Sequence, residues 1–200
     1  MQNKRSEEIT LITLILFLIA FFLYGFFSGE NSAGGGLLTG DFVSIWGNLQ
    51  IFLNNDLNTA IMHEEYMDSR SPIAYIVHKF LNPFTEDVLS FRISVFCISL
   101  LLPLVFFFAI KKKFFNNGNF LLIFISTIIL ISPFYRTTSY WGLQENYGLI
   151  FLVLTYLFFY NFHKDIQVNS NKFLSIFLIC LFSSLTFYFD SKLIIIPFLC

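Results

Sequence analysis

Five charged groups in this chain stand where a reaction at a membrane surface could use them. The first is Asp41, which precedes apolar residues at helical spacing. A carboxylate there could act as a general base toward an acceptor hydroxyl or amine, or could stabilise the first turn of a helix through the helix dipole. The second is Arg70, in Asp-Ser-Arg-Ser-Pro. Its planar guanidinium could bind phosphate, or form a surface ion pair with Asp68 or Glu65.

The other three groups lie later in the chain. Arg136 and Glu145 flank a segment that contains Tyr140 and Trp141. These rings fit either an interfacial aromatic belt or a sugar site, in which aromatic faces stack on a sugar while polar groups take its hydroxyls. Lys192 stands between two apolar runs, where it could hold a lipid phosphate or simply extend to the interface from a helix end.

Several other kinds of site are not indicated. The segment His63-Glu64-Glu65-Tyr66-Met67 lacks the second histidine of the zinc motif His-Glu-x-x-His, and Gly34-Gly35-Gly36 lacks the Lys-Ser/Thr of a phosphate loop. The net charge of −1 and the scattered basic residues argue against nucleic acid as a partner. We therefore predict no metal ligands and no cofactor, and leave open a divalent ion at Asp41.

The composition indicates a membrane protein. Hydrophobic residues make up 56% of the chain and charged residues 12%, against about 25% charged in an ordinary soluble domain. We predict an all-α, polytopic transmembrane bundle in a single domain. Six spans are expected, the last incomplete: 9–27, 90–110, 120–133, 147–162, 173–189 and 193–200. The first span is too long and too aromatic for a cleaved signal peptide, so an anchor is favoured.

A long polar segment, 28–89, follows the first span. Phe42, Ile45, Trp46 and Leu49 recur at helical spacing, which predicts an amphipathic helix over 41–54 lying on the membrane or against the bundle. Two shorter helices are expected over 57–66 and 73–80, the second ending near Asn82-Pro83. Polar loops are expected over 132–146 and 163–172, and a tight turn over 116–119. Inside the second span, Pro103 is tolerable because a neighbouring helix can satisfy the carbonyl that proline leaves unpaired.

The basic residues of the loops predict the orientation. With the N-terminus in the cytoplasm, the inner segments hold seven of them: Lys4, Arg5, Lys111, Lys112, Lys113, Lys164 and Lys172. Ten of the 13 acidic residues, among them Asp41 and Glu145, then fall on the outer side. We expect an integral membrane protein of a bacterial inner membrane, whose chemistry occurs on the outer face.

This layout resembles the N-terminal half of the GT-C glycosyltransferases, polytopic enzymes that use polyprenyl-phosphate-linked sugars. The protein O-mannosyltransferase and aminoarabinose transferase branch is most similar. The resemblance is carried by an early acid in the first outer loop, Ser-Arg-Ser-Pro-Ile-Ala-Tyr (Ser69 to Tyr75), Ser-Pro-Phe-Tyr-Arg (Ser132 to Arg136), Glu145 and Asp-Ser-Lys before Pro197. The single proline at Pro72 departs from the His-Pro-Pro-Leu-Tyr-like segment of that branch.

The resemblance implies roles for these residues. Asp41 would be the catalytic acid or base, Glu145 a second-loop carboxylate near the site, and Lys192 a phosphate-binding cation. Arg70 and Tyr75 would line the substrate site, together with Arg136. The implied partners are a lipid-linked sugar donor, a lipid, glycan or protein acceptor, and membrane lipids.

Two other functions stay open from the sequence. One is a polytopic transporter or lipid flippase without covalent chemistry. Such proteins often carry polar or interrupted spans near the middle of the membrane, whereas here the polar residues lie mainly in the outer loops. The other is a non-catalytic subunit or fragment. Because the sixth run covers only about 12 Å at about 1.5 Å per residue, we expect the N-terminal part of a longer protein or a truncated reading frame.

Overall fold

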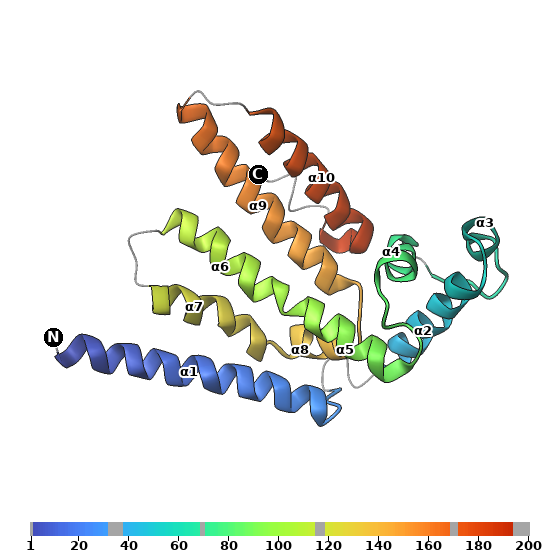
Figure 1. Ribbon diagram of the computed structural model, residues 1–200, viewed down its shortest axis with the longest axis horizontal. Coiled ribbons are helices and arrows are strands. Elements are labelled where there is room, and N and C mark those ends of the chain that lie inside the picture. The colour runs from blue at the N-terminus through green and yellow to red at the C-terminus, as the bar shows by residue number, and fades with distance from the viewer. Residues whose placement is uncertain (1, 32–37, 69–70, 115–118, 169–171, 194–200) are drawn as a thin grey trace.

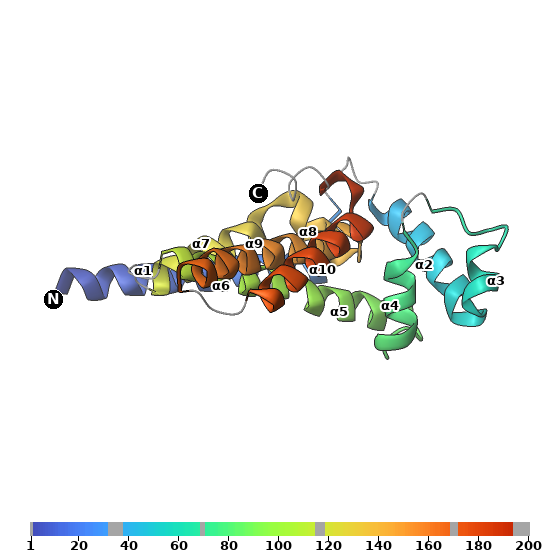
Figure 2. The same ribbon diagram turned by 90° about the horizontal axis from the view of Figure 1, so that it is seen from above.

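The computed structural model describes residues 2–31, 38–68, 71–114, 119–168 and 172–193. Within these ranges every regular element is a helix, so the predicted all-α class is confirmed. Five long segments run side by side, as Figures 1 and 2 show. They are α1 (Gln2–Phe27), α5 with α6 (Val88–Ser99 and Leu101–Lys113), α7 with the 3₁₀ turn η2 (Asn119–Thr127 and Ile128–Ile131), α9 (Glu145–Val168) and α10 (Phe173–Phe189).

Two of these segments, in the part of the chain that the structure describes, are helices long and apolar enough to cross a membrane. They are Ser6–Phe27 and Val88–Lys113. A third span is available if Asn119–Ile131 and Pro133–Tyr140, which bend by 72° at their junction, act as one. This supports a membrane protein with the first and second predicted spans. The fourth and fifth predicted spans correspond to parts of α9 and to α10, and the sixth lies outside the described residues.

The second span is interrupted close to Pro103. Proline has no backbone N–H, so it cannot bond the carbonyl of Ser99, four residues earlier. The helix is interrupted at Leu100, between α5 and α6. Tyr135 from a neighbouring helix donates its hydroxyl to the Ser99 carbonyl oxygen at 2.5 Å. The expectation that a neighbour satisfies the freed carbonyl is confirmed.

The polar segment after α1 folds into three helices at one end of the bundle: α2 (Leu38–Asn54), α3 (Leu57–Ile61) and α4 (Ile73–Leu81). The amphipathic pattern of α2 is confirmed, because Phe42, Ile45 and Leu49 are buried. α3 is shorter than expected, and α4 ends at Asn82 as expected. Lys79 of α4 donates to the carbonyl oxygens of Phe52 and Asn55, both at 2.6 Å, which caps the C-terminus of α2 with a cation.

The predicted loop over 132–146 is wrong, because its first half is a buried helix, α8 (Pro133–Tyr140). Ser132 caps this helix by accepting from the Tyr135 N–H, and Pro133 occupies its first position. Its polar residues are buried because their hydroxyls bond within the helix: Thr137 donates to the Pro133 carbonyl at 2.7 Å, and Ser139 to the Tyr135 carbonyl at 2.6 Å. The predicted loop over 163–172 is also partly helical, since α9 continues to Val168.

The two ends of the bundle differ in character. One end, here named the polar end, carries α2, α3, α4, α8, the start of α9 and the 3₁₀ turn η3 (Ser191–Leu193). At the other, named the lysine end, α6 finishes with Lys111, Lys112 and Lys113, close to where α1 and α7 begin. The predicted turn over 116–119 lies there, mostly outside the described residues. The separation of acidic from basic loops in the sequence is thus a separation in space.

Candidate functional site

A small polar hollow of about 150 Å³ at the polar end brings Asp41 and Tyr75 together. α2 contributes Asp41, Ser44, Ile45 and Asn48 along one face, α4 contributes Tyr75, and the segment between α3 and α4 contributes Met67 and Asp68. Asp41 lies in the first turn of α2 with its side chain exposed. Among the described residues no hydrogen-bond or ion-pair partner is found for its carboxylate, so it can accept a proton from a bound hydroxyl.

Tyr75 forms the floor of this hollow. Its side chain is 1% exposed and its ring stacks on Phe52 at 5.4 Å. The hydroxyl donates to Asp68 Oδ2 and accepts from Asn48 Nδ2 at 3.4 Å. Burial, and next the hydrogen bond to the Asp68 carboxylate, raise the pKa of the Tyr75 phenol. The group therefore stays protonated and acts as a donor that fixes Asp68.

Arg70 falls outside the described residues, so its predicted role is neither supported nor opposed. Its neighbour Asp68 is the carboxylate that sequence reasoning treated only as an ion-pair partner. The structure places Asp68 with Asp41 at the hollow. Tyr66 packs edge-on against Tyr75 at 6.1 Å, and burial, with a smaller contribution from the Asp68 charge, raises its pKa to about 12.

A buried polar network joins α4 to the helix bundle. Asn82 Oδ1 accepts the Phe84 N–H at 3.0 Å, so the Asn82 amide nitrogen is left to donate to His78 Nδ1 at 3.1 Å. His78 then carries its proton on Nε2, which donates to the Tyr147 hydroxyl on α9 at 3.1 Å. His78 is 4% exposed, and burial lowers its pKa to about 4. The imidazole is thus neutral near pH 7.

Glu145 and Lys192 face each other at the start of α9. Glu145 lies in the first turn of that helix and is 4% exposed. Lys192 Nζ lies 3.9 Å from Glu145 Oε1, and its side chain is 74% exposed. Gly148 permits this approach, because a Cβ there would lie 3.0 Å from Asp190 Cβ and 3.1 Å from Leu193 Cδ1. An exposed ammonium therefore stands over a buried carboxylate.

Arg136 is buried in the contact between α8 and α1. Its guanidinium forms an ion pair with Glu30, which follows α1. The guanidinium carbon Cζ also lies over the ring of Phe21, 4.0 Å from the ring centroid. Its Nε donates to the Tyr140 hydroxyl at 3.3 Å. The side chain is 7% exposed. Arg136 thus fastens α8 to α1, and its charge is balanced by Glu30.

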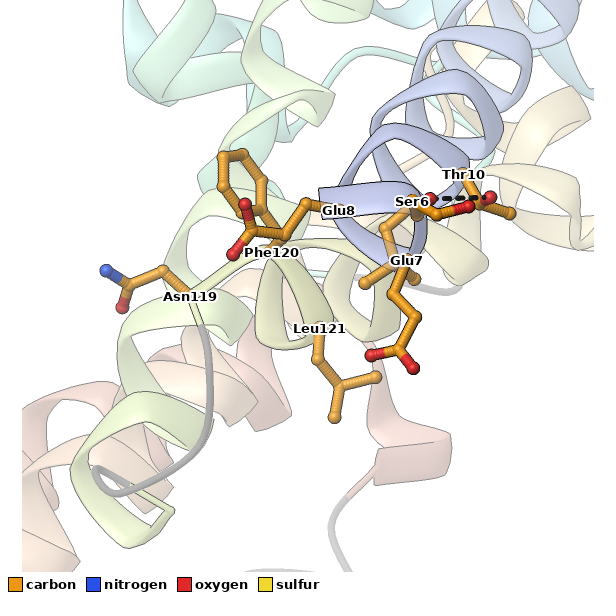
Figure 3. Close-up of a pocket in the computed structure, with 8 residues that line it drawn as sticks. Ser6, Glu7, Glu8, Thr10, Asn119, Phe120 and Leu121 are labelled. Carbon is orange, nitrogen blue, oxygen red and sulfur yellow. Dashed lines mark hydrogen bonds between the residues drawn. The ribbon is translucent and has the colours of Figure 1, made fainter. Parts of the chain in front are cut away.

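A second hollow, of about 670 Å³, lies at the lysine end between α1 and α7. Its lining includes Glu7, Glu8 and Leu121. Figure 3 shows the two glutamates extending from α1 in different directions, beside the hydrogen bond from Thr10 to the Ser6 carbonyl. None of the predicted site residues lines it. The described residues hold no group of three or more His, Cys, Asp or Glu placed to bind a metal.

Three functional candidates were missed from the sequence. In the sequence Asn48 interrupts the apolar face of α2. In the structure its buried amide donates a hydrogen bond to the Tyr75 hydroxyl. His78 follows Tyr75 by one helical turn, which signals the same face of α4. Gln144 precedes Glu145, is 1% exposed, and has neither amide atom hydrogen-bonded among the described residues. A buried, unpaired amide is a signal that only the three-dimensional structure reveals.

Comparison with known proteins adds no assignment: no family model, no curated protein and no solved structure matches this chain.

Proposed function

We propose that this protein is a membrane glycosyltransferase that moves a sugar from a polyprenyl-phosphate donor to an acceptor on the extracytoplasmic side. The observation that carries the proposal is the placement of the open Asp41 carboxylate at the polar end, which also holds the exposed Lys192 ammonium over Glu145. A base and a cation at one membrane face are the two groups that such a transfer needs.

In this step Asp41 accepts the proton of an acceptor hydroxyl as the oxygen attacks the anomeric carbon of the donor sugar. The new bond joins that oxygen to the carbon, and the bond between the carbon and the lipid-phosphate oxygen breaks. The departing phosphate carries the electron pair and is stabilised by Lys192, whose exposed side chain can reach a lipid headgroup. Because the phosphate leaves as a stable anion, it requires charge stabilisation more than protonation.

The buried polar network supports treating the two groups as parts of one site. Tyr75 and His78 are one turn apart on α4, and His78 bonds Tyr147, two residues after Glu145. The helix that lines the hollow with Tyr75 is therefore joined, by the hydrogen bond between His78 and Tyr147, to the helix that begins at Glu145. Gln144 offers an unpaired amide beside Glu145, of the kind that a sugar hydroxyl can pair with.

The proposal extends to partners and location. The donor is a polyprenyl-phosphate sugar, the acceptor a lipid, glycan or protein, and the protein lies in a bacterial inner membrane with its N-terminus in the cytoplasm. No cofactor is required by the step. Two helices suited to crossing a membrane support the membrane location, and the aromatic and acidic polar end supports an extracytoplasmic site.

Replacement of the proposed base tests the function. In the full-length protein reconstituted in vesicles, we expect Asp41→Asn to lower sugar transfer from labelled polyprenyl-phosphate sugars by about 10²-fold or more. The amide keeps the size of the side chain but cannot accept the proton. The readout is label in the acceptor, measured alongside the amount of protein in the membrane fraction.

Glu86→Gln is the matched control, because Glu86 is an exposed carboxylate of the same segment that lies outside the hollow. It should transfer at the wild-type rate. Wild-type transfer by Asp41→Asn would refute the role of Asp41. Movement of the labelled donor across the bilayer without transfer by the wild type would favour a flippase.

A further inference from the structure

α4 exposes large apolar side chains on one face, although its other face is already buried against the rest of the protein. Phe80 and Leu81 are 63% and 76% exposed, whereas His78 and Tyr75 on the other face are buried. A helix whose outer face meets water carries polar residues on that face. Large exposed apolar side chains gathered on one edge indicate an apolar neighbour.

The exposed edge continues around the turn into the second span. Phe84 and Leu89 are 57% and 58% exposed, and Ile93, one turn further along α5, is 44% exposed. The turn is held in place, because Asn82 Oδ1 accepts the Phe84 N–H at 3.0 Å and the Asn82 amide donates to Ser94 Oγ at 2.9 Å. We name this surface, formed by Phe80, Leu81, Phe84 and Leu89, the α4–α5 corner.

A groove of about 550 Å³ runs from the corner along the spanning helix. Its apolar lining comes from Leu81, Pro83 and Phe84 on one side, and from Ile93, Cys97 and Ile98 of α5 on the other. From Ser90 to Ile98 the groove follows α5 for about 12 Å at about 1.5 Å per residue, most of the depth of one leaflet of a hydrocarbon core about 30 Å thick. Its length and lining suit one hydrocarbon chain.

We propose that the α4–α5 corner is a membrane anchor lying in the lipid interface, and that the groove beneath it holds an acyl chain of a bilayer phospholipid. Lipid is favoured because the exposed apolar residues resume, after the exposed Glu86 and Asp87 of the turn, at Leu89 and Ile93 of α5, part of a helix suited to crossing the membrane. α4 also runs across the direction of the long helices in Figure 2, as an interfacial helix must. The anchor is independent of any transferase activity.

Spin labels measure the surroundings of the corner directly. The full chain, with Cys97, Cys180 and Cys200 replaced by alanine, receives a nitroxide at Phe84→Cys and is placed in phosphatidylcholine vesicles. Leu104→Cys on α6, 50% exposed, gives the lipid reference, and Glu64→Cys beside α3 gives the water reference. We expect the Phe84 label to collide with dissolved oxygen about as often as the Leu104 label does. Its collisions with a water-soluble nickel complex should be several-fold less frequent than those of the Glu64 label.

Leu81→Cys repeats the measurement if the Phe84 variant inserts poorly. A label on Cys97, in a separate variant that keeps this cysteine and has only Cys180 and Cys200 replaced by alanine, reports on the groove itself. Nickel collision at the corner equal to that of Glu64 would overturn the anchor. Spin–spin broadening that disappears on dilution with unlabelled chain would show that a second copy covers the corner, which would also overturn it. An oxygen-accessible corner with a nickel-accessible Cys97 would refute the acyl chain in the groove.

Discussion

His78 links α4 to α9 through its hydrogen bond with Tyr147, and its protonation state determines which hydrogen bonds its ring can form. The imidazole lies edge-on to Phe91 at 4.9 Å and accepts at Nδ1 from Asn82 while donating at Nε2 to Tyr147. A second proton on Nδ1 would face the Asn82 amide, which is itself a donor. Charging this ring would therefore break one hydrogen bond and leave a buried cation.

Stability should consequently fall as the pH is lowered from about 6.5 toward 4. The pKa of His78 is about 4 in the folded chain against 6.5 when exposed, so the unfolded chain binds the proton more tightly. This contribution is complete above about pH 6.5, and about 3 kcal/mol of it is lost once the pH reaches about 4. Asp56 and Asp87, whose carboxyl pKa values are lowered by hydrogen bonds from Thr59 and Ser90, lose their contributions only at lower pH.

His78→Gln isolates this effect. The variant keeps an amide that can donate to Tyr147 but no longer titrates, so its unfolding free energy should change little across the same pH range. Unfolding in mixed micelles of dodecyl maltoside and sodium dodecyl sulfate provides the measurement. His163→Gln, at an exposed histidine, should retain the loss seen in the wild type. An undiminished loss in His78→Gln would contradict the assignment.

At the scale of elements, the contact between α1 and α8 is the one that could not be predicted from the sequence. α10 and α4 were predictable because apolar runs and the Ser71-Pro72 and Asn82-Pro83 pairs mark their ends. α8 was not, because Arg136 and three successive hydroxyl residues are typical of a loop. Its helix start was nevertheless signalled by Ser132-Pro133. The pairing of Arg136 with Glu30 joins residues far apart in sequence, so no local pattern could predict it.

Gly25 sets how closely α1 and α8 can approach. A Cβ at this position would overlap the Tyr140 hydroxyl and lie 2.7 Å from Glu30 Oε2. The Tyr140 hydroxyl is held there because it donates to the Phe22 carbonyl oxygen at 2.6 Å. We therefore expect Gly25→Ala to lower the free energy of unfolding by about 1–3 kcal/mol, measured in the same mixed micelles.

Gly47→Ala is the matched control, because nothing lies within 4 Å of a Cβ at that helical position. It should raise the free energy of unfolding by about 0.5–1 kcal/mol, since alanine favours a helix over glycine. A Gly25→Ala variant as stable as the wild type would show that the two helices pack less closely than described.

At the scale of the whole molecule, the separation of charge along the bundle distinguishes its two ends. The candidate site residues Asp41, Tyr75, Glu145 and Lys192 lie at the polar end, while Lys111 to Lys113 end α6 at the lysine end. Loop charges predicted this separation because each crossing reverses the side of the next loop. The grouping of Asp41 with Asp68 and Tyr75 required the fold, since it depends on how α4 packs on α2.

The placement of the polar end away from the cytosol is the claim on which the proposed chemistry rests, and labelling from outside intact cells tests it most directly. In the cysteine-free full chain, Glu64→Cys stands for the polar end and Lys112→Cys for the lysine end, both exposed in the structure. A membrane-impermeant maleimide should label position 64 in intact cells and position 112 only after lysis. Labelling of position 112 but not of position 64 in intact cells would contradict the account.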